Sequence, residues 1–112
     1  MATAKDFQKI ALAIEGTTEA PHFDRTAFKA RRIYASLAPD GLTANLRFPP
    51  DEQEFRCTAQ PDAYRKIANK WGDAGWTNAT LSALTADDLK VALMSAWRFQ
   101  DTPKKRSPSK RD

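Results

Sequence analysis

The sequence predicts an α+β fold with an antiparallel sheet, because the spacing of its apolar residues changes along the chain. Near both ends, apolar residues recur every three to four positions, as in amphipathic helices. Between residues 26 and 48 they recur at every second position, which is typical of half-buried strands. A Pro39–Asp40–Gly41 turn signal falls inside this second region and indicates a chain reversal between neighbouring strands.

The first helix is predicted close to the N-terminus. Thr3 is a suitable N-cap, and Asp6 stands three residues later, at the capping-box position. An apolar stripe at helical spacing follows, made of Phe7, Ile10, Ala11 and Ile14. Gly16 is a natural stop, and we expect residues 17–21 to be a connector.

Three strands are predicted next, at residues 26–31, 33–38 and 42–48. Their alternation indicates a meander with one buried face and one solvated face. The solvated face would carry Lys29 and Arg31 on the first strand, Tyr34 on the second and Arg47 on the third.

Pro49 and Pro50 close the third strand, because proline cannot donate to a sheet ladder. The acids that follow them suit the first turn of a short helix, which would turn Phe55 inward and end before Pro61. Residues 62–71 are compatible with a strand or with a short helix. Residues 76–81 read as another strand.

The last helix is predicted to begin at Thr85, with Asp88 completing a capping box. Its apolar stripe consists of Leu89, Ala92, Leu93, Ala96 and Trp97. Pro103 marks its limit. We therefore expect one folded domain over residues 1–100 and a basic, disordered tail over residues 101–112.

The basic character of the chain is concentrated in that tail. The formal charge is +4 over 112 residues, and residues 101–112 hold five bases and two acids, which leaves +1 for residues 1–100. Cys57 is the only cysteine, so no intrachain disulfide can form, which fits a reducing compartment. No apolar run is long enough for a signal peptide or a membrane span, so we expect a cytoplasmic protein without a membrane partner.

No catalytic or metal-binding motif is recognisable. His22 is the only histidine, and we expect it to be a half-buried structural residue at a strand entrance rather than the partner of Cys57 in catalysis. The acids at positions 51, 52 and 54 are explained by the helix dipole. There is no glycine-rich phosphate loop and no zinc spacing, so we expect neither enzyme activity nor a metal or cofactor.

Two features could contact nucleic-acid phosphates. One is the solvated sheet face with Lys29, Arg31 and Arg47, beside which Tyr34 would offer an aromatic surface. The other is the tail, with Lys104, Lys105, Arg106, Lys110 and Arg111. Charged outer strand positions and charge runs are more often simply solvated surface, and that explanation of both features stays open. His22, Trp71 and Trp76 could line a pocket, although core packing is the default for the tryptophans.

The order and spacing of several short segments resemble the MmcQ/YjbR-like family of small bacterial domains. These segments are Pro21–His22–Phe23, Tyr34–Ala35–Ser36–Leu37, Asn45–Leu46, Trp71–Gly72, Gly75–Trp76 and Ala96–Trp97. The resemblance covers about residues 4–100. It implies a two-layer sandwich in the order α-β(3)-α-β(2)-α, with helices on one face of an antiparallel sheet and a strand near residues 64–68. It also implies DNA binding through the sheet and its hairpins, without catalytic residues.

Three hypotheses follow. The leading one is weak, sequence-unspecific DNA binding through Lys29, Arg31, Arg47 and the tail. The alternative is a protein- or peptide-interaction module with a secretion-chaperone-like fold, which would offer a sheet edge or apolar surface to its partner. The third is an enzyme or small-ligand binder with a pocket at His22 and the tryptophans.

Overall fold

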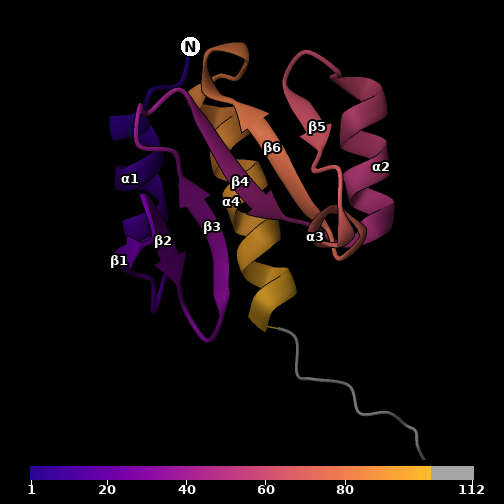
Figure 1. The fold of residues 1–112 in the computed structure, drawn as a ribbon. Helices are drawn as coiled ribbons and strands as arrows, with labels where there is room; N and C mark the ends of the chain where they lie inside the picture. The colour runs from indigo at the N-terminus through magenta and orange to yellow at the C-terminus, as the bar shows by residue number, and fades with distance from the viewer. Residues whose placement is uncertain (102–112) are drawn as a thin grey trace, which may run out of the picture.

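A computed structural model describes residues 1–101 of the chain, and the tail bases proposed above lie outside the described residues. Figure 1 shows the order of the elements. They are α1 (Ala4–Ala13), β1 (Thr18–His22), β2 (Arg25–Lys29), β3 (Ile33–Leu37), β4 (Thr43–Arg47), α2 (Pro50–Ala59), β5 (Tyr64–Lys66), α3 (Lys70–Asp73), β6 (Trp76–Thr80), the 3-10 turn η1 (Leu81–Ala83) and α4 (Ala86–Asp101).

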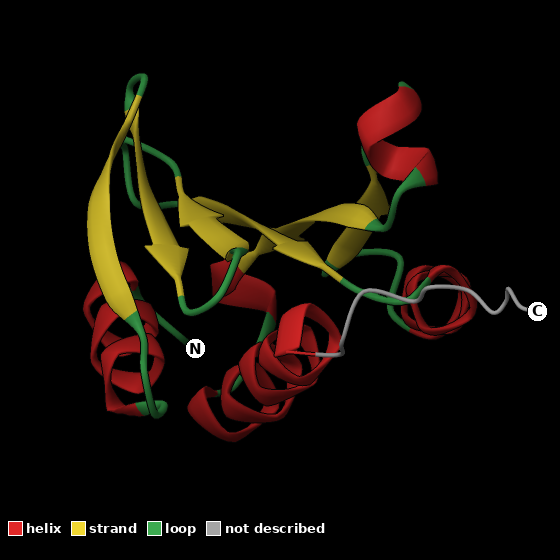
Figure 2. Ribbon diagram, turned by 90° about the horizontal axis from the view of Figure 1, so that it is seen from below, coloured by secondary structure: helices red, strands yellow, loops and turns green. Residues whose placement is uncertain are grey.

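The strands form one antiparallel sheet in the order β1-β2-β3-β4-β6-β5. The helices α1, α4 and α2 cover one face of this sheet (Figure 2), as the predicted two-layer α+β sandwich requires. The β1–β2 hairpin and α3 instead rise on the opposite side, one toward each end of the sheet. That side, which we call the open face, is turned toward the viewer in Figure 1.

The core lies between the sheet and its three covering helices. The largest buried side chains come from both layers and include Phe7, Phe28, Phe48, Tyr64, Leu46, Leu89 and Leu93. The capping boxes predicted for the first and last helices are both formed: Asp6 N donates to Thr3 Oγ1, and Asp88 N donates to Thr85 Oγ1. None of the described helices is long and apolar enough to cross a membrane.

The sheet differs from the prediction at its first edge. The segment predicted to be a connector is strand β1, which pairs with β2 from Thr18–Lys29 to His22–Arg25. Four strands therefore precede α2 rather than three. The alternation signal is missing from this segment because all five residues of β1 are exposed, so nothing forces one face of the strand to be apolar. At the other edge, β5 confirms the strand that the family resemblance implied.

Two aromatic residues face the opposite way from the prediction. Tyr34 is fully buried rather than on the solvated face, because a register shift at Phe28/Lys29 breaks the alternation of β3 and Tyr34 joins the core. Its hydroxyl lies 2.8 Å from Thr17 Oγ1. Phe55 is 71% exposed rather than turned inward. The face of α2 that meets the sheet runs through Gln53, and a residue two positions later lies on the far side of a helix.

Candidate nucleic-acid interface

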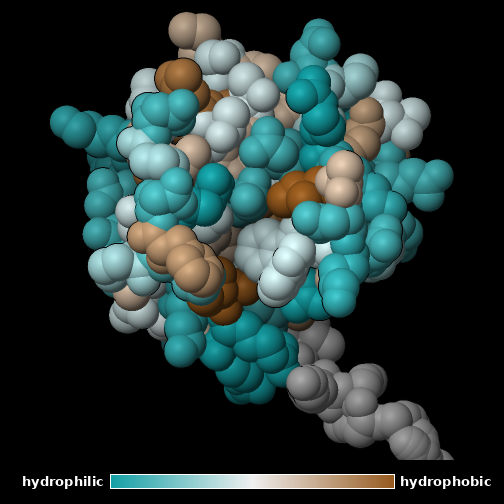
Figure 3. All heavy atoms as spheres, in the orientation of Figure 1, coloured by the Kyte–Doolittle hydropathy of each residue, from teal (hydrophilic) through white to brown (hydrophobic). Residues whose placement is uncertain are grey.

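The open face combines basic and neutral side chains without an acid. The residues that share it follow from the pairing register and the alternation of side chains. They are Thr18, Ala20 and His22 on β1, Arg25, Ala27 and Lys29 on β2, Ser36 on β3, Thr43, Asn45 and Arg47 on β4, Trp76, Asn78 and Thr80 on β6 and Arg65 on β5. Four of these residues are Arg or Lys. Figure 3 shows this side of the molecule as largely hydrophilic, with a few apolar residues among the polar ones.

The protein has many charged residues, but acidic and basic side chains are unevenly distributed over its surface. Residues 1–101 contain thirteen Lys or Arg and thirteen Asp or Glu, so the described chain has no net charge. The strand positions of the open face nevertheless hold an excess of basic residues, and the nearest acids recorded are Asp24 and Asp40, which act on Arg25. The net charge of the folded domain, which is close to zero, therefore does not indicate how this surface interacts with an anion.

Hydrogen bonds across the strands hold the polar side chains of the open face. Arg25 Nε donates to Ser36 Oγ over 2.9 Å, and Arg25 Nη2 donates to the Ser36 carbonyl oxygen over 3.3 Å. Asn78 Nδ2 donates to Asn45 Oδ1 over 3.0 Å. Partial burial lowers the pKa of Arg25, while Asp24 and Asp40 raise it, and an arginine remains cationic under all ordinary conditions. The face is thus a preorganised polar platform.

Arg31 was predicted on the first strand of the meander, but it lies in the turn between β2 and β3, two residues beyond the end of β2. Its side chain is exposed, but its backbone is fixed. The amides of Arg31 and Arg32 donate to the buried Gln100 Oε1 over 3.0 and 2.9 Å. Arg32 Nη1 donates to the Gln100 carbonyl oxygen over 2.6 Å. The C-terminal end of α4 therefore holds the turn that presents Arg31.

Arg47 is less free to bind an anion than predicted. Its Nε donates to the Ala74 carbonyl oxygen over 2.9 Å, and its guanidinium carbon lies 5.1 Å from the centroid of the Phe99 ring. The exposed bases are instead Lys29 and Arg65 on the open face and Arg31 in the β2–β3 turn. Arg65 was missed because the segment from 62 to 71 was ambiguous, and only its pairing with Asn78 places it on the open face.

The suggested pocket at His22, Trp71 and Trp76 is not assembled. His22 is on edge strand β1, whereas Trp76 is on β6, four strands away, which is about 19 Å at normal strand spacing. His22 is exposed rather than half-buried, Trp71 is 62% exposed rather than packed in the core, and Trp76 is partly buried. A ligand pocket shared by all three residues is therefore excluded.

Cys57 also lies apart from His22, since α2 packs beside β5 at the opposite edge of the sheet (Figure 1). Burial raises the pKa of the Cys57 thiol, an effect that Lys66 partly offsets. A raised pKa disfavours the thiolate that nucleophilic catalysis needs. Among the described residues, no group of His, Cys, Asp and Glu could hold a metal ion.

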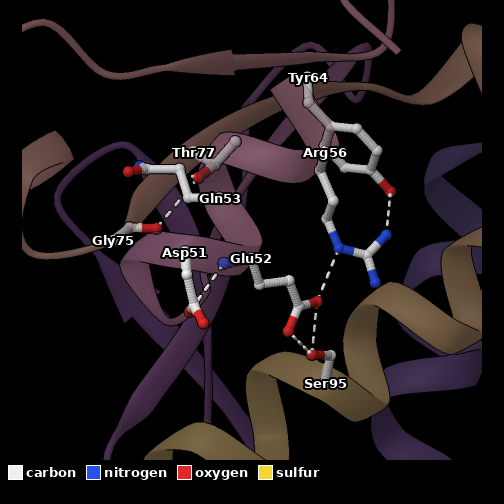
Figure 4. Close-up of polar contacts among 8 residues, drawn as sticks. All are labelled: Asp51, Glu52, Gln53, Arg56, Tyr64, Gly75, Thr77 and Ser95. Atoms are coloured by element: carbon white, nitrogen blue, oxygen red, sulfur yellow. Dashed lines mark hydrogen bonds and ion pairs between the residues drawn. The ribbon is translucent and has the colours of Figure 1, made fainter. Parts of the chain in front are cut away.

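The most connected polar cluster joins helices rather than forming a site (Figure 4). Arg56 Nε donates to Glu52 Oε2 over 2.7 Å, and Ser95 Oγ of α4 lies 2.6 Å from both Glu52 carboxylate oxygens. The Arg56 guanidinium also lies over the rings of Phe48 and Tyr64. Each group thus has its partners within the fold, which identifies the cluster as a link between α2, α4 and the sheet.

Comparisons with known proteins agree with this architecture. The YjbR family model matches residues 12–99. The chain is similar to the crystal structure of the Deinococcus radiodurans protein DR2400, which carries the domain DUF419. That similarity has a TM-score of 0.79 and 21% sequence identity, and covers 96% of this chain and 85% of the other. No curated protein sequence matches the chain.

Proposed function

Because the chain belongs to the YjbR family, and because the open face of its sheet carries bases without acids, we propose that it is a non-catalytic DNA-binding protein. Binding takes place through phosphates and is weak and sequence-unspecific. The observation that carries the proposal is the uneven distribution of charge over the surface. A protein without net charge can still attract an anion to one face if basic side chains outnumber acidic ones on that face.

Phosphate contacts fit the geometry of this face better than base contacts. Lys29, Arg31 and Arg65 are exposed cations on different strands or turns, and the neutral Asn and Thr side chains between them can donate further hydrogen bonds. Contacts of this kind position a protein on nucleic acid without reading its sequence. With only a few of them, the affinity depends strongly on salt.

The test compares two triple variants of the full chain in titrations of labelled duplex DNA. The first variant, K29Q/R31Q/R65Q, removes the exposed bases of the open face, Lys29 and Arg65, together with Arg31 of the β2–β3 turn. The matched control, K5Q/K9Q/K90Q, removes three exposed lysines from α1 and α4 on the other side of the protein. Both variants change the net charge equally, so only the position of the lost charge differs.

We expect the open-face variant to lose salt dependence and the control to keep most of it. Each phosphate contact contributes about −0.9 to the slope of log affinity against log salt, so three contacts account for about 40-fold of the affinity lost between 50 and 200 mM salt. Equal effects of the two variants would contradict the proposal. A third variant with glutamine at Lys104, Lys105, Arg106, Lys110 and Arg111 separates the contribution of the tail.

A second candidate is the protein- or peptide-interaction module, favoured by the exposed edge strand β1. An extended peptide could add to such an edge through backbone hydrogen bonds. Pro21 has no backbone N–H and therefore interrupts the row of donors that a peptide would need along this edge. For this reason we rank the interaction module second. Amide hydrogen exchange distinguishes the two, because a peptide added to the edge would slow exchange in β1, whereas DNA on the open face would not pair with it.

A further inference from the structure

Two aromatic side chains stand out from the open side of the protein without contributing to its core. Phe23 is 94% exposed at the tip of the β1–β2 hairpin, and Trp71 is 62% exposed on α3. Figure 2 shows that this hairpin and α3 both rise on the side away from the covering helices, toward opposite ends of the sheet. Large aromatic residues normally contribute buried area, so two exposed ones on one side of a small domain call for a functional explanation.

The backbone at Phe23 is unfavourable for the residue that occupies it. His22 and Arg25 pair across the two-residue turn Phe23–Asp24, and Phe23 has a φ of 60°. The first central position of such a turn normally takes glycine, and a bulky residue with positive φ is strained. Neither burial nor turn geometry explains a phenylalanine here. Strain of this kind is typical of residues that contact a ligand.

Trp71 is held outward by a fixed support. Asn69 Oδ1 accepts a hydrogen bond from Trp71 N over 2.8 Å and caps α3. The neighbouring Gly72 is buried, and a Cβ on it would lie 1.7 Å from the Ile67 carbonyl oxygen. The Gly72 carbonyl oxygen in turn accepts a hydrogen bond from Gln53 over 3.0 Å. The close packing of Gly72 therefore orients α3 so that Trp71 points to solvent.

Resting on the proposed function, we infer that the preferred ligand is single-stranded nucleic acid. Its nucleobases stack on Phe23 and Trp71, and its phosphates are held by the Lys and Arg side chains of the open face between them. Aromatic platforms combined with a basic surface are the usual means of binding single strands. In a duplex the base faces are covered by their neighbours, and exposing them costs unstacking energy. Asp24 beside Phe23 is the one acid at the hairpin tip, and its charge is partly countered by Arg25.

The experiment measures the affinity of the full chain for three labelled probes at low salt. These are an oligothymidylate of about 12 nucleotides, within the site sizes of small single-strand binders, an abasic strand of the same length, and a duplex of the same length. We expect the oligothymidylate to bind most tightly. Equal affinity for the strand with bases and the abasic strand would overturn the stacking inference while leaving phosphate binding intact.

Three variants identify the stacking residues. F23G removes the ring and relieves the backbone strain, so we expect a higher melting temperature together with weaker oligothymidylate binding, a combination that misfolding cannot produce. We expect F23G and W71A each to lower the affinity about 5- to 150-fold, the range for losing one base–aromatic stack. F55A is the matched control, because the exposure of Phe55, 71%, lies between those of Trp71 and Phe23, but Phe55 is on α2.

The outcomes separate this inference from the proposed function. Unchanged oligothymidylate binding by F23G and W71A, with the duplex bound as tightly as the single strand, would overturn the inference and leave the proposed DNA binding standing. Absence of binding to all three probes at low salt would overturn both, and would move Phe23 and Trp71 to a protein-contact role.

Discussion

Gln100 offers the sharpest test of how the fold presents its basic turn. Replacing it with methionine keeps the length of the side chain but removes the Oε1 acceptor for the amides of Arg31 and Arg32, and the Nε2 donor to the Trp97 carbonyl oxygen. Each lost hydrogen bond of this kind costs about 0.5–1.5 kcal/mol where water can partly replace the partner. Apolar burial of the methionine offsets part of the sum, so we expect a loss of about 2 kcal/mol in the free energy of unfolding.

The assay is urea unfolding followed by tryptophan fluorescence, with Q8M as control. Gln8 is exposed and makes one hydrogen bond, to Glu19, so its replacement should change stability by less than about 0.5 kcal/mol. A loss of 2 kcal/mol lowers the melting temperature of a domain of this size by about 8–16 °C. A cost for Q100M no larger than that for Q8M would show that Gln100 does not hold the β2–β3 turn in place.

Three further predictions concern stability and reactivity. Gly75→Ala should lower the free energy of unfolding, measured in urea, by at least about 2 kcal/mol, because its φ is +108° and a Cβ would lie 2.0 Å from the Phe48 carbonyl oxygen. The control is Gly16→Ala, which should cost only about 1 kcal/mol, because Gly16 also has a positive φ but has open space around it. Burial raises the pKa of Tyr34, so its contribution to stability is complete below about pH 10, the pKa of an unfolded tyrosine, and is lost as the pH rises through the folded pKa. The alkaline fall in melting temperature should therefore be shallower in Tyr34→Phe, and an identical fall would count against it. Burial also raises the pKa of Cys57, so alkylation by iodoacetamide should have its pH midpoint above about 8.5 in the folded protein and move down to that value in urea.

The fold was predictable wherever one side of an element is buried. The stripe of the first helix and the strand that carries Leu46 both read directly from their spacing, because burial forces the apolar period. The exposed strand β1 has no such constraint, and the bulge that buries Tyr34 is set by pairing with β2, which no local pattern reveals. Phe55 was predicted inward because it is apolar, yet the polar Gln53 holds that position through three hydrogen bonds.

The candidate site was only partly predictable for a related reason. Lys29 could be chosen because its strand alternates clearly, whereas Arg31 was assigned to that strand but lies in the turn after it. Arg65 depends on the register between β5 and β6. Arg47 was chosen for its face, but its partners come from residues distant in sequence. The exposure of Phe23 and Trp71 depends on how the hairpin and α3 leave the sheet, which the sequence alone does not specify.

Binding of nucleic acid to the open face can be followed residue by residue in amide NMR spectra recorded during titration with an unlabelled oligonucleotide. We expect shift changes in β2, β4, β6, the β1–β2 turn and α3 that decrease as salt is added, with little change in α1 and in the middle of α4. Shift changes confined to α1 and α4, or none at low salt, would contradict it.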